Sequence, residues 1–236
     1  MFGPILVPSL GGSLYYVRFK DVFSINTWLY FLKKKSKVFS KFKEYKALVE
    51  NQIGKKIKVL KTDNGGEFCE KEFEKFCKEC GIAWQKKTPY TPQQNGVTER
   101  MNRSLMEKAR SMLSGVGLWQ EFWVVVVDTT CYLKIWSPTS ALVDKTPHGV
   151  WSGKKPSIAH LIVFGCDTFM HVPKEKRIKL ANKAKKCIIV SYKDGIKGYK
   201  LRNSITRKIV YSRDVVFREV KNTSRNEDEP VITQYF

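Results

Sequence analysis

Two carboxylates in well-marked surroundings carry the clearest chemical signal in this chain. Asp63 lies in KTDNGGEF, and Glu99 lies 36 positions further on in NGVTERMNR. Enzymes that cut or join phosphodiesters need carboxylates from separate elements, because two divalent ions about 3.5 to 4 Å apart must hold the attacking and the leaving oxygen. The pair therefore predicts metal-dependent chemistry on DNA phosphodiesters. A third carboxylate, which this chemistry requires, is not evident in the sequence.

The surrounding patterns place both residues at the ends of regular elements. Residues 58–62 predict a short strand that ends just before Asp63, and a tight turn at 64–66 leads toward a helix over 67–79. A second short strand is expected at 82–85, followed by a loop over 86–96 whose prolines and Asn95-Gly96 argue against regular structure. Residues 97–113 then predict a helix with Glu99 in its first turn. Active sites gather at the carboxyl ends of strands in open α/β sheets.

Glu99 admits a less specific interpretation. With Arg103 and Glu107 it recurs at i, i+4 spacing on one helix face, which is also the pattern of a surface ion pair of little energetic consequence. The preceding loop and the spacing from Asp63 favour a functional carboxylate.

The rest of the chain divides into an α/β part and a β part. Residues 13–21 and 26–32 predict an antiparallel hairpin, and 36–51 predicts an amphipathic helix that Gly54 ends. Residues 119–133 favour a buried helix, although their valine run would also suit a strand. Residues 136–160 are rich in turn-forming residues, short apolar runs over 161–217 indicate a small barrel-like domain, and 218–236 predicts a disordered tail.

Composition points to a polyanion as the partner. Lys+Arg 43 against Asp+Glu 22 gives a formal net charge of +21, more than solubility requires, with aromatic residues interleaved among the basic ones. DNA or RNA is favoured over the alternative of a merely lysine-rich surface. No apolar run approaches the roughly 18 residues of a membrane span, and the first residues lack the features of a signal peptide, so we expect an intracellular protein with no membrane partner.

The six cysteines do not predict a zinc site. Cys77 and Cys80 form one C-x-x-C pair, but no second pair or matching histidines accompany it. Buried free thiols on a helix and on strands are expected instead.

The chain resembles the integrase region of copia-type LTR retrotransposon Pol polyproteins. The similar segments are FGPI and VPSLGG within residues 2–12, LKTDNGGEF at 60–68, TPYTPQQNGVTERMNRSL at 88–105, and HLIVFGC, KCIIVSYKDGIKGYKL and RKIVYSRDVVF in the last third. The resemblance covers almost everything up to residue 217. It implies a ribonuclease-H-like core over 1–135, a mixed sheet flanked by helices with its first strand largely missing, then a linker over 136–160, an SH3-like domain over 161–217 and a disordered tail over 218–236.

The resemblance also implies a reaction and a site. The reaction is DNA integration: trimming of a DNA 3′ end, then attack of the new 3′ hydroxyl on target DNA, with Mg²⁺ or Mn²⁺ as cofactor. Asp63 and Glu99 correspond to the second and third carboxylates of the metal-binding triad. The residues where element DNA ends would be held are Asn64, Gln93, Asn95 and Arg103. DNA and further copies of the chain are the implied partners, with no small-molecule substrate. The expected location is the nucleus if the chain is functional and the cytoplasm otherwise.

The start of the chain departs from the family pattern. The first triad carboxylate would lie at or just ahead of Met1, and Asp21 lies at the wrong edge of the sheet to replace it. We therefore expect a weakly held metal and little or no integration activity from these 236 residues alone. Two alternatives remain: a non-catalytic DNA-binding relic of a retroelement, and an unstable product without a role.

Overall fold

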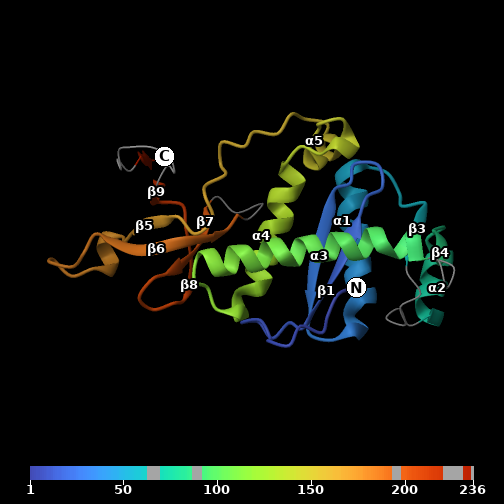
Figure 1. Ribbon diagram of the computed structural model, residues 1–236, viewed down its shortest axis with the longest axis horizontal. Helices are drawn as coiled ribbons and strands as arrows, with labels where there is room; N and C mark the ends of the chain where they lie inside the picture. Colours follow the sequence, from blue (N-terminus) through green and yellow to red (C-terminus); the bar gives the residue numbers. More distant parts are fainter. Residues whose placement is uncertain (63–69, 87–91, 193–197, 220–230, 235–236) are drawn as a thin grey trace. The chain divides into compact units, whose positions relative to one another are not determined.

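The computed structural model describes residues 1–62, 70–86, 92–192, 198–219 and 231–234. Its contacts divide the chain into two units, Met1–Lys154 and Lys155–Phe236 (Figure 1). The division falls within the range 136–160 that was predicted as a linker, and that range also holds the short helices η3 (Ser140–Leu142) and α5 (Pro147–Ser152). The predicted boundaries of the parts stay a prediction.

The strands of the first unit form two separate pairs among the described residues. β1 (Tyr15–Lys20) and β2 (Thr27–Leu32) pair antiparallel, whereas β3 (Val59–Thr62) and β4 (Ala83–Lys86) pair parallel. The predicted hairpin and both short strands are confirmed. Antiparallel and parallel pairing together give the mixed pairing expected of a ribonuclease-H-like core, but β1 and β3 are not hydrogen-bonded to each other.

Helices surround these strands. After η1 (Lys35–Lys37) come α1 (Val38–Ile53) and α2 (Glu70–Glu79), and α3 (Pro92–Gly115), η2 (Gln120–Phe122) and α4 (Trp123–Trp136) follow. Gly54 ends α1 in the left-handed conformation at φ 64°, as its position predicts. The valine run of 119–133 is helical because Val125, Val126 and Val127 are all buried, so tertiary packing outweighs the strand propensity of valine.

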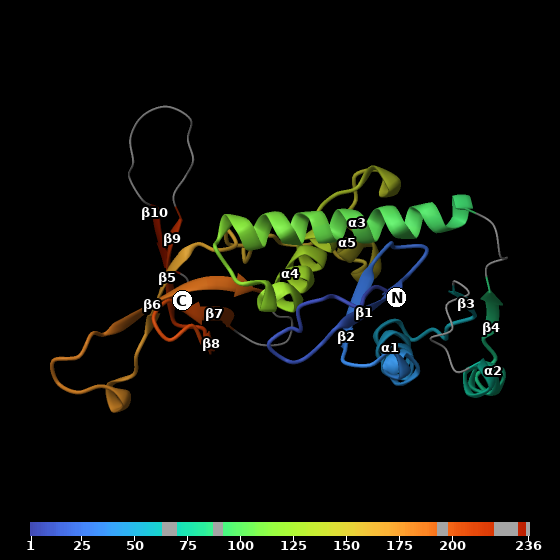
Figure 2. The same ribbon diagram turned by 60° about the horizontal axis from the view of Figure 1, so that its bottom comes forward.

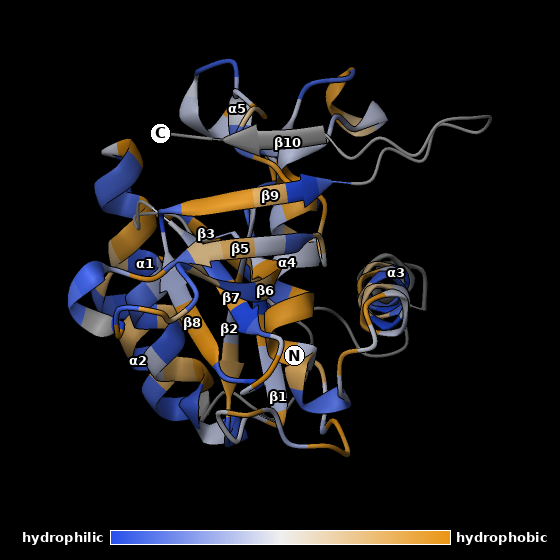
Figure 3. Cartoon of the chain, turned by 90° about the vertical axis from the view of Figure 1, so that its left-hand side faces the viewer, coloured by the Kyte–Doolittle hydropathy of each residue, from blue (hydrophilic) through white to orange (hydrophobic). Residues whose placement is uncertain are grey.

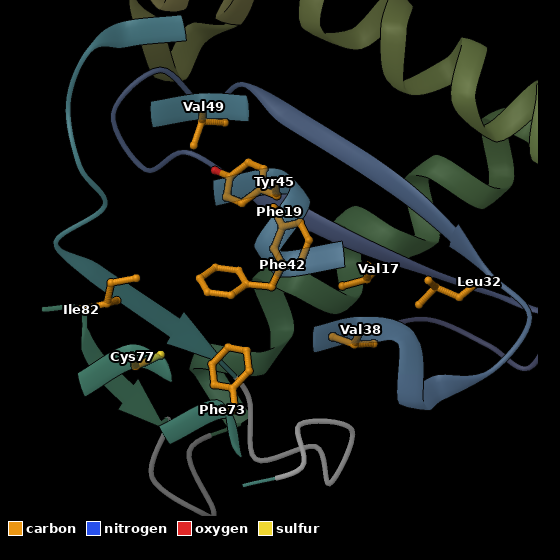
Figure 4. Packing of buried hydrophobic residues seen from close by; sticks show 10 residues of the cluster. All are labelled: Val17, Phe19, Leu32, Val38, Phe42, Tyr45, Val49, Phe73, Cys77 and Ile82. Carbon is orange, nitrogen blue, oxygen red and sulfur yellow. The ribbon is translucent and has the colours of Figure 1, made fainter. Parts of the chain in front are cut away.

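A single apolar core joins the two strand pairs through α1. Phe42 is fully buried, and its ring lies 5.7 Å from Phe19 of β1 and 5.1 Å from Phe73 of α2. Figure 4 shows side chains of β1, α1 and α2 gathered in this core. Cys77 of α2 lies in it as a free buried thiol, as predicted. The strand pairs thus share one core although they share no hydrogen bonds.

One prediction about the loop before Glu99 is wrong. Residues 86–96 were expected to lack regular structure, but α3 begins at Pro92 and continues through Asn95 and Gly96. Proline is well accommodated in the first turn of a helix, where its missing N–H would have no intrahelical acceptor. Glu99 therefore lies in the second turn of α3, not in the first.

The second unit is a six-stranded antiparallel sheet in the order β10-β9-β5-β6-β7-β8. Its elements are β5 (Asp167–His171), η4 (Lys174–Lys176), β6 (Ala184–Ser191), β7 (Tyr199–Asn203), β8 (Ile209–Ser212), β9 (Val215–Glu219) and β10 (Val231–Gln234). Figure 3 shows that β8 and β9 are largely hydrophobic. Cys187, Ile189 and Leu201 are fully buried, so neighbouring strands supply one apolar face. A small β domain was expected for 161–217, and the sheet lies in that range except for the end of β9 and for β10.

The predicted disordered tail differs from what the structure describes. β9 continues to Glu219, and β10 pairs with it antiparallel from Val231 to Gln234. The stretch V-I-T-Q is rich in β-branched residues and finds a partner in the exposed edge of β9. Residues 220–230 and 235–236 of the predicted tail lie outside the described residues.

Candidate functional site

The predicted site residues fall partly outside the described residues. Asp63 and Asn64 lie there, directly after the end of β3 at Thr62. Gln93 and Asn95 lie on the first turns of α3, but the structure does not describe their side chains. Glu99 and Arg103 are described, and both are exposed on α3. The convergence of Asp63 with Glu99 stays a prediction.

Contacts with the rest of the first unit fix α3, the helix that carries Glu99. Leu105 and Ala109 are buried, and the Tyr16 hydroxyl of β1 donates a 3.5 Å hydrogen bond to Asn102 Oδ1. Tyr16 is itself 1% exposed and stacks on Phe2, with ring centroids 5.1 Å apart, and burial raises its pKa well above the usual range. Tyr16 therefore stays a neutral donor at physiological pH. α3 crosses the β1 and β2 pair as a long helix (Figure 2).

The carboxylate of Glu99 forms no ion pair among the described residues. The ion pairs formed among the described residues do not include a pair between Glu99 and Arg103. The alternative interpretation of Glu99, a surface ion pair on the helix, therefore loses its main support. An exposed carboxylate on a rigid helix is a ligand of the kind that Mg²⁺ takes.

The end of β3 is fixed by a hydrogen bond that the sequence did not predict. Trp84 of β4 donates from Nε1 to Thr62 Oγ1 at 2.9 Å, and Thr62 is 8% exposed. The register pairs Thr62 with Lys86, so the last residues of both strands lie side by side. The backbone is thus held at the residue that directly precedes Asp63.

A run of exposed lysines leads into this strand end. Lys55, Lys56, Lys58 and Lys61 are all exposed. The connection from α1 to β3 is anchored by Glu50, which pairs with Lys46 at 2.8 Å and accepts a 2.9 Å hydrogen bond from the Ile57 amide. Burial raises the pKa of Glu50, but the bonds from Lys46 and Ile57 outweigh it, so this pKa is lowered and the anchor stays ionised. These four lysines precede Asp63 in the sequence, and their positive charge would attract the phosphate backbone of a nucleic acid.

The carboxylate of Asp21 is engaged in local hydrogen bonds and, among the described residues, not in a metal site. Its Oδ2 accepts hydrogen bonds from the Ser24 amide at 2.7 Å and from the Ser24 hydroxyl at 2.6 Å. The Asp21 carboxylate thereby closes the turn between β1 and β2. This agrees with the inference that Asp21 does not replace a missing triad carboxylate.

Metal ligation at the site rests on residues beyond those described. Among the described residues, no three His, Cys, Asp or Glu side chains are grouped closely enough to hold a metal ion. Asp63 lies outside the described residues, and the carboxylate of Glu99 is a suitable donor for its part of a metal site. The described helices include none long and apolar enough to cross a membrane.

Comparison with known proteins assigns both units. Residues 2–92 match the integrase core domain, and residues 166–231 match the retroviral polymerase SH3-like domain. The chain combines an integrase core with a retroviral SH3-like domain. The integrase core match ends just after α3 begins, so β1 to β4 with α1 and α2 lie within it.

The similar curated proteins are retrovirus-related Pol polyproteins of plant transposons. The chain is 48% identical over 217 residues to that from transposon TNT 1-94 of Nicotiana tabacum, which covers 92% of this chain and 16% of that protein. It is 34% identical over 216 residues to that from transposon RE2 of Arabidopsis thaliana, covering 92% of this chain and 15% of that protein. The chain thus spans about one sixth of the length of these relatives.

Two solved structures are similar at low identity. One is a cryoEM structure of the simian T-cell lymphotropic virus intasome in complex with PP2A regulatory subunit B56 gamma, at 15% identity and a TM-score of 0.48, covering 83% of this chain and 68% of that chain. The other is the HTLV-2 integrase catalytic core domain in complex with magnesium in a trimeric form, at 18% identity and a TM-score of 0.43, covering 56% of this chain and 81% of that chain.

Proposed function

We propose that this integrase core serves DNA integration by a retroelement, as part of a longer protein. The observation that carries the proposal is the exposed, unpaired carboxylate of Glu99 on a helix that Tyr16 and Leu105 anchor, in a chain whose residues 2–92 match an integrase core. The reaction is removal of nucleotides from a DNA 3′ end by water, followed by attack of the new 3′ hydroxyl on a target phosphodiester.

Asp63 and Glu99 are the proposed ligands of Mg²⁺ or Mn²⁺. The metal would lower the pKa of the attacking water or hydroxyl and neutralise charge on the leaving oxygen. The chain's own contribution is to hold the ligands in place. The Thr62–Trp84 hydrogen bond fixes the backbone before Asp63, and the Tyr16–Asn102 bond fixes the helix of Glu99.

The proposed DNA contacts are of two kinds. Asn64, Gln93, Asn95 and Arg103 would hold the ends of element DNA, since all four lie on the segments that carry the two carboxylates. The four exposed lysines before β3 would bind phosphates without regard to sequence. Each phosphate contact should make binding more sensitive to salt. Assembly with further copies of the chain belongs to the same proposal.

The test of catalysis uses a chain extended at its N-terminus by a segment that supplies a third carboxylate. In a gel assay with Mg²⁺ or Mn²⁺, this chain should show 3′ processing and strand transfer, and Glu99→Gln should abolish both. Glu107→Gln, two turns along the same exposed helix, is the matched control and should retain activity. Equal activity of the two variants would contradict the role of Glu99.

The 236 residues alone should behave differently. We expect their turnover to be no higher than that of the Asp63→Asn, Glu99→Gln double variant, because two carboxylates do not hold the two ions that the reaction needs. Turnover clearly above the double variant would refute this expectation.

DNA binding without catalysis is the second candidate function, and the lysines before β3 favour it. Fluorescence anisotropy with a short duplex should show affinity that falls steeply with salt, at a slope unchanged by the double variant. Replacing Lys55, Lys56 and Lys58 by Gln should lower that slope by about 2 to 3, one per lost phosphate contact. An unchanged slope would remove these lysines from the interface.

A further inference from the structure

A cavity in the first unit is lined by residues that have no role in the proposed integration reaction. It measures about 640 Å³ and lies between α3, α4, β1 and the segment that contains η3. Its apolar walls come from several elements: Ile25, Met101, Leu105, Met112, Leu133, Ile135, Pro138 and Pro147. Such a volume matches the lower to middle range of small-molecule sites.

Cations gather along this cavity. Arg18 of β1, Lys108 of α3 and Lys134 of α4 all line it, together with the exposed Glu107. The described ion pairs do not include Arg18, Lys108 or Lys134. Among the described residues the cavity therefore combines apolar walls with three cations and one carboxylate, that of Glu107.

Arg18 shows the energetic cost of this arrangement. Its Nη1 atom is buried without a hydrogen-bond partner among the described groups. Leaving a buried charged donor unsatisfied is expensive, because the group has lost its water and has gained no acceptor. An acceptor that enters the cavity with a negative charge would remove that cost.

The three cations also repel one another. Burial lowers the pKa of Lys134, and the charges of Lys108 and Arg18 lower it further. Burial is likewise the main cause that lowers the pKa of Arg18. Burial, and then the charge of Arg18, also lower the pKa of Lys20. A bound anion would relieve this repulsion, so the electrostatics and the unsatisfied donor favour the same kind of ligand.

We propose that this cavity binds a small organic anion, with an apolar body against the Met101, Leu105 and Met112 side of α3 and its charged group against Arg18 and Lys134. The guanidinium can donate two parallel hydrogen bonds to a carboxylate or a sulfonate, which a lysine does not match.

The test compares two probes that differ by one sulfonate group. The anion 8-anilinonaphthalene-1-sulfonate and the neutral N-phenyl-1-naphthylamine share one apolar skeleton. On the full chain, fluorescence titration should show one saturable site for the anion and at least roughly tenfold weaker binding of the neutral probe, the factor that corresponds to about 1.4 kcal/mol. Equal affinity for both probes would reduce the site to an apolar cavity and overturn the proposal.

Variants locate the site. Arg18→Gln and Lys134→Gln should each weaken the anionic probe by roughly tenfold and leave the neutral probe unchanged. Lys37→Gln removes the same charge from an exposed position far from the cavity lining and should change neither. If Lys37→Gln weakens the anion equally, the attraction is only that of the net charge, and the proposal fails.

The probe titration needs two further controls, one for folding and one for the number of sites. Each variant is used only if its thermal melt remains cooperative, and Lys134→Gln together with the probe comparison on the unaltered chain decides the matter if Arg18→Gln does not fold. Binding at several equivalent sites would also overturn the proposal. None of these outcomes depends on DNA or on metal, so they are independent of the integration assay.

Discussion

At the scale of single residues, the Thr62 hydroxyl is the most informative contact. It accepts the indole hydrogen bond of Trp84 and lies next to Asp63. Thr62→Val keeps the shape of the side chain but removes the acceptor from the indole N–H of the half-buried Trp84. We expect a loss of about 1 kcal/mol in the free energy of unfolding, the usual effect of removing such a hydrogen bond. Urea denaturation measures it.

Thr62→Ser is the matched control, because it retains the hydroxyl and loses only a methyl group. It should be more stable than Thr62→Val. In a Trp84→Phe background the donor is absent, so the difference between the two variants at position 62 should shrink to a few tenths of a kcal/mol. If the difference persists there, the stabilisation comes from packing rather than from the hydrogen bond.

At the scale of elements, the gap between β1 and β3 could accommodate one additional β-strand. A cavity of about 590 Å³ lies along Val17 to Asp21 and Lys58 to Thr62, with Tyr45 and Val49 of α1 beside it and Met1 in its lining. The N-terminus lies between β1 and β3 (Figure 2).

The edges of this gap carry backbone groups suited to pairing. Phe2 and Tyr16 exchange two backbone hydrogen bonds, of 2.9 and 3.1 Å, as an antiparallel bridge. Alternation along a strand then points the amides of Arg18 and Lys20 into the gap. On β3 the Lys58 carbonyl bonds to β4, so Val59 and Lys61 point the other way, toward the gap.

We therefore expect an extended segment fused ahead of Met1 to add a strand here. Six alternating apolar and polar residues should continue the register of Phe2 along β1 and raise the melting temperature by at least about 3 °C. Hydrogen exchange should slow at the amides of Arg18 and Lys20, and on β3 at Lys61. An extension of equal length with prolines opposite Arg18 and Lys20 lacks the required N–H groups and should do neither. Equal effects of both extensions would exclude strand pairing.

Some elements follow from the local sequence pattern, and others depend on distant partners. For α4 the valine run suited helix and strand alike, and burial decided for the helix. Periodicity was sufficient for α1, which buries Val38, Phe42, Tyr45 and Val49. It failed at Pro92 to Gly96, where residues that disfavour helices in general are compatible with a helix start. It also failed for β10, whose pairing depends on the distant edge of β9. A long-range partner such as Trp84 for Thr62 leaves no local pattern.

At the scale of the whole molecule, two properties respond to pH in opposite directions. The net charge of +21 repels itself, and this repulsion decreases as lysines lose protons above about pH 10. Buried thiols act against stability in the same range. Burial, assisted by Asp128, raises the pKa of Cys131 from 9.0 to about 12, although Arg18 and Lys134 oppose it. In the second unit, burial and then Glu219 raise the pKa of Cys166 to about 11.

The raised pKa values of these thiols make the folded protein less stable at high pH. Below pH 9 both states keep these protons, so the stabilisation is fully present. Above it the unfolded chain releases the thiol protons while the folded chain retains them up to about pH 11 to 12. The unfolded state then binds fewer protons, and the free energy of unfolding falls as the pH rises.

Because lysine titration works in the other direction, the test is a difference between variants. Urea unfolding at pH 7.5, 9.0 and 10.5 should show that the stability gap between the unaltered chain and Cys131→Ala narrows as the pH rises, since the variant has no thiol to ionise when unfolded. Cys80→Ala, at a half-buried thiol on the same unit, is the control for the loss of a cysteine side chain. A gap for Cys131→Ala that widens toward pH 10.5 would mean that the folded chain stabilises the thiolate, which its apolar surroundings should not allow.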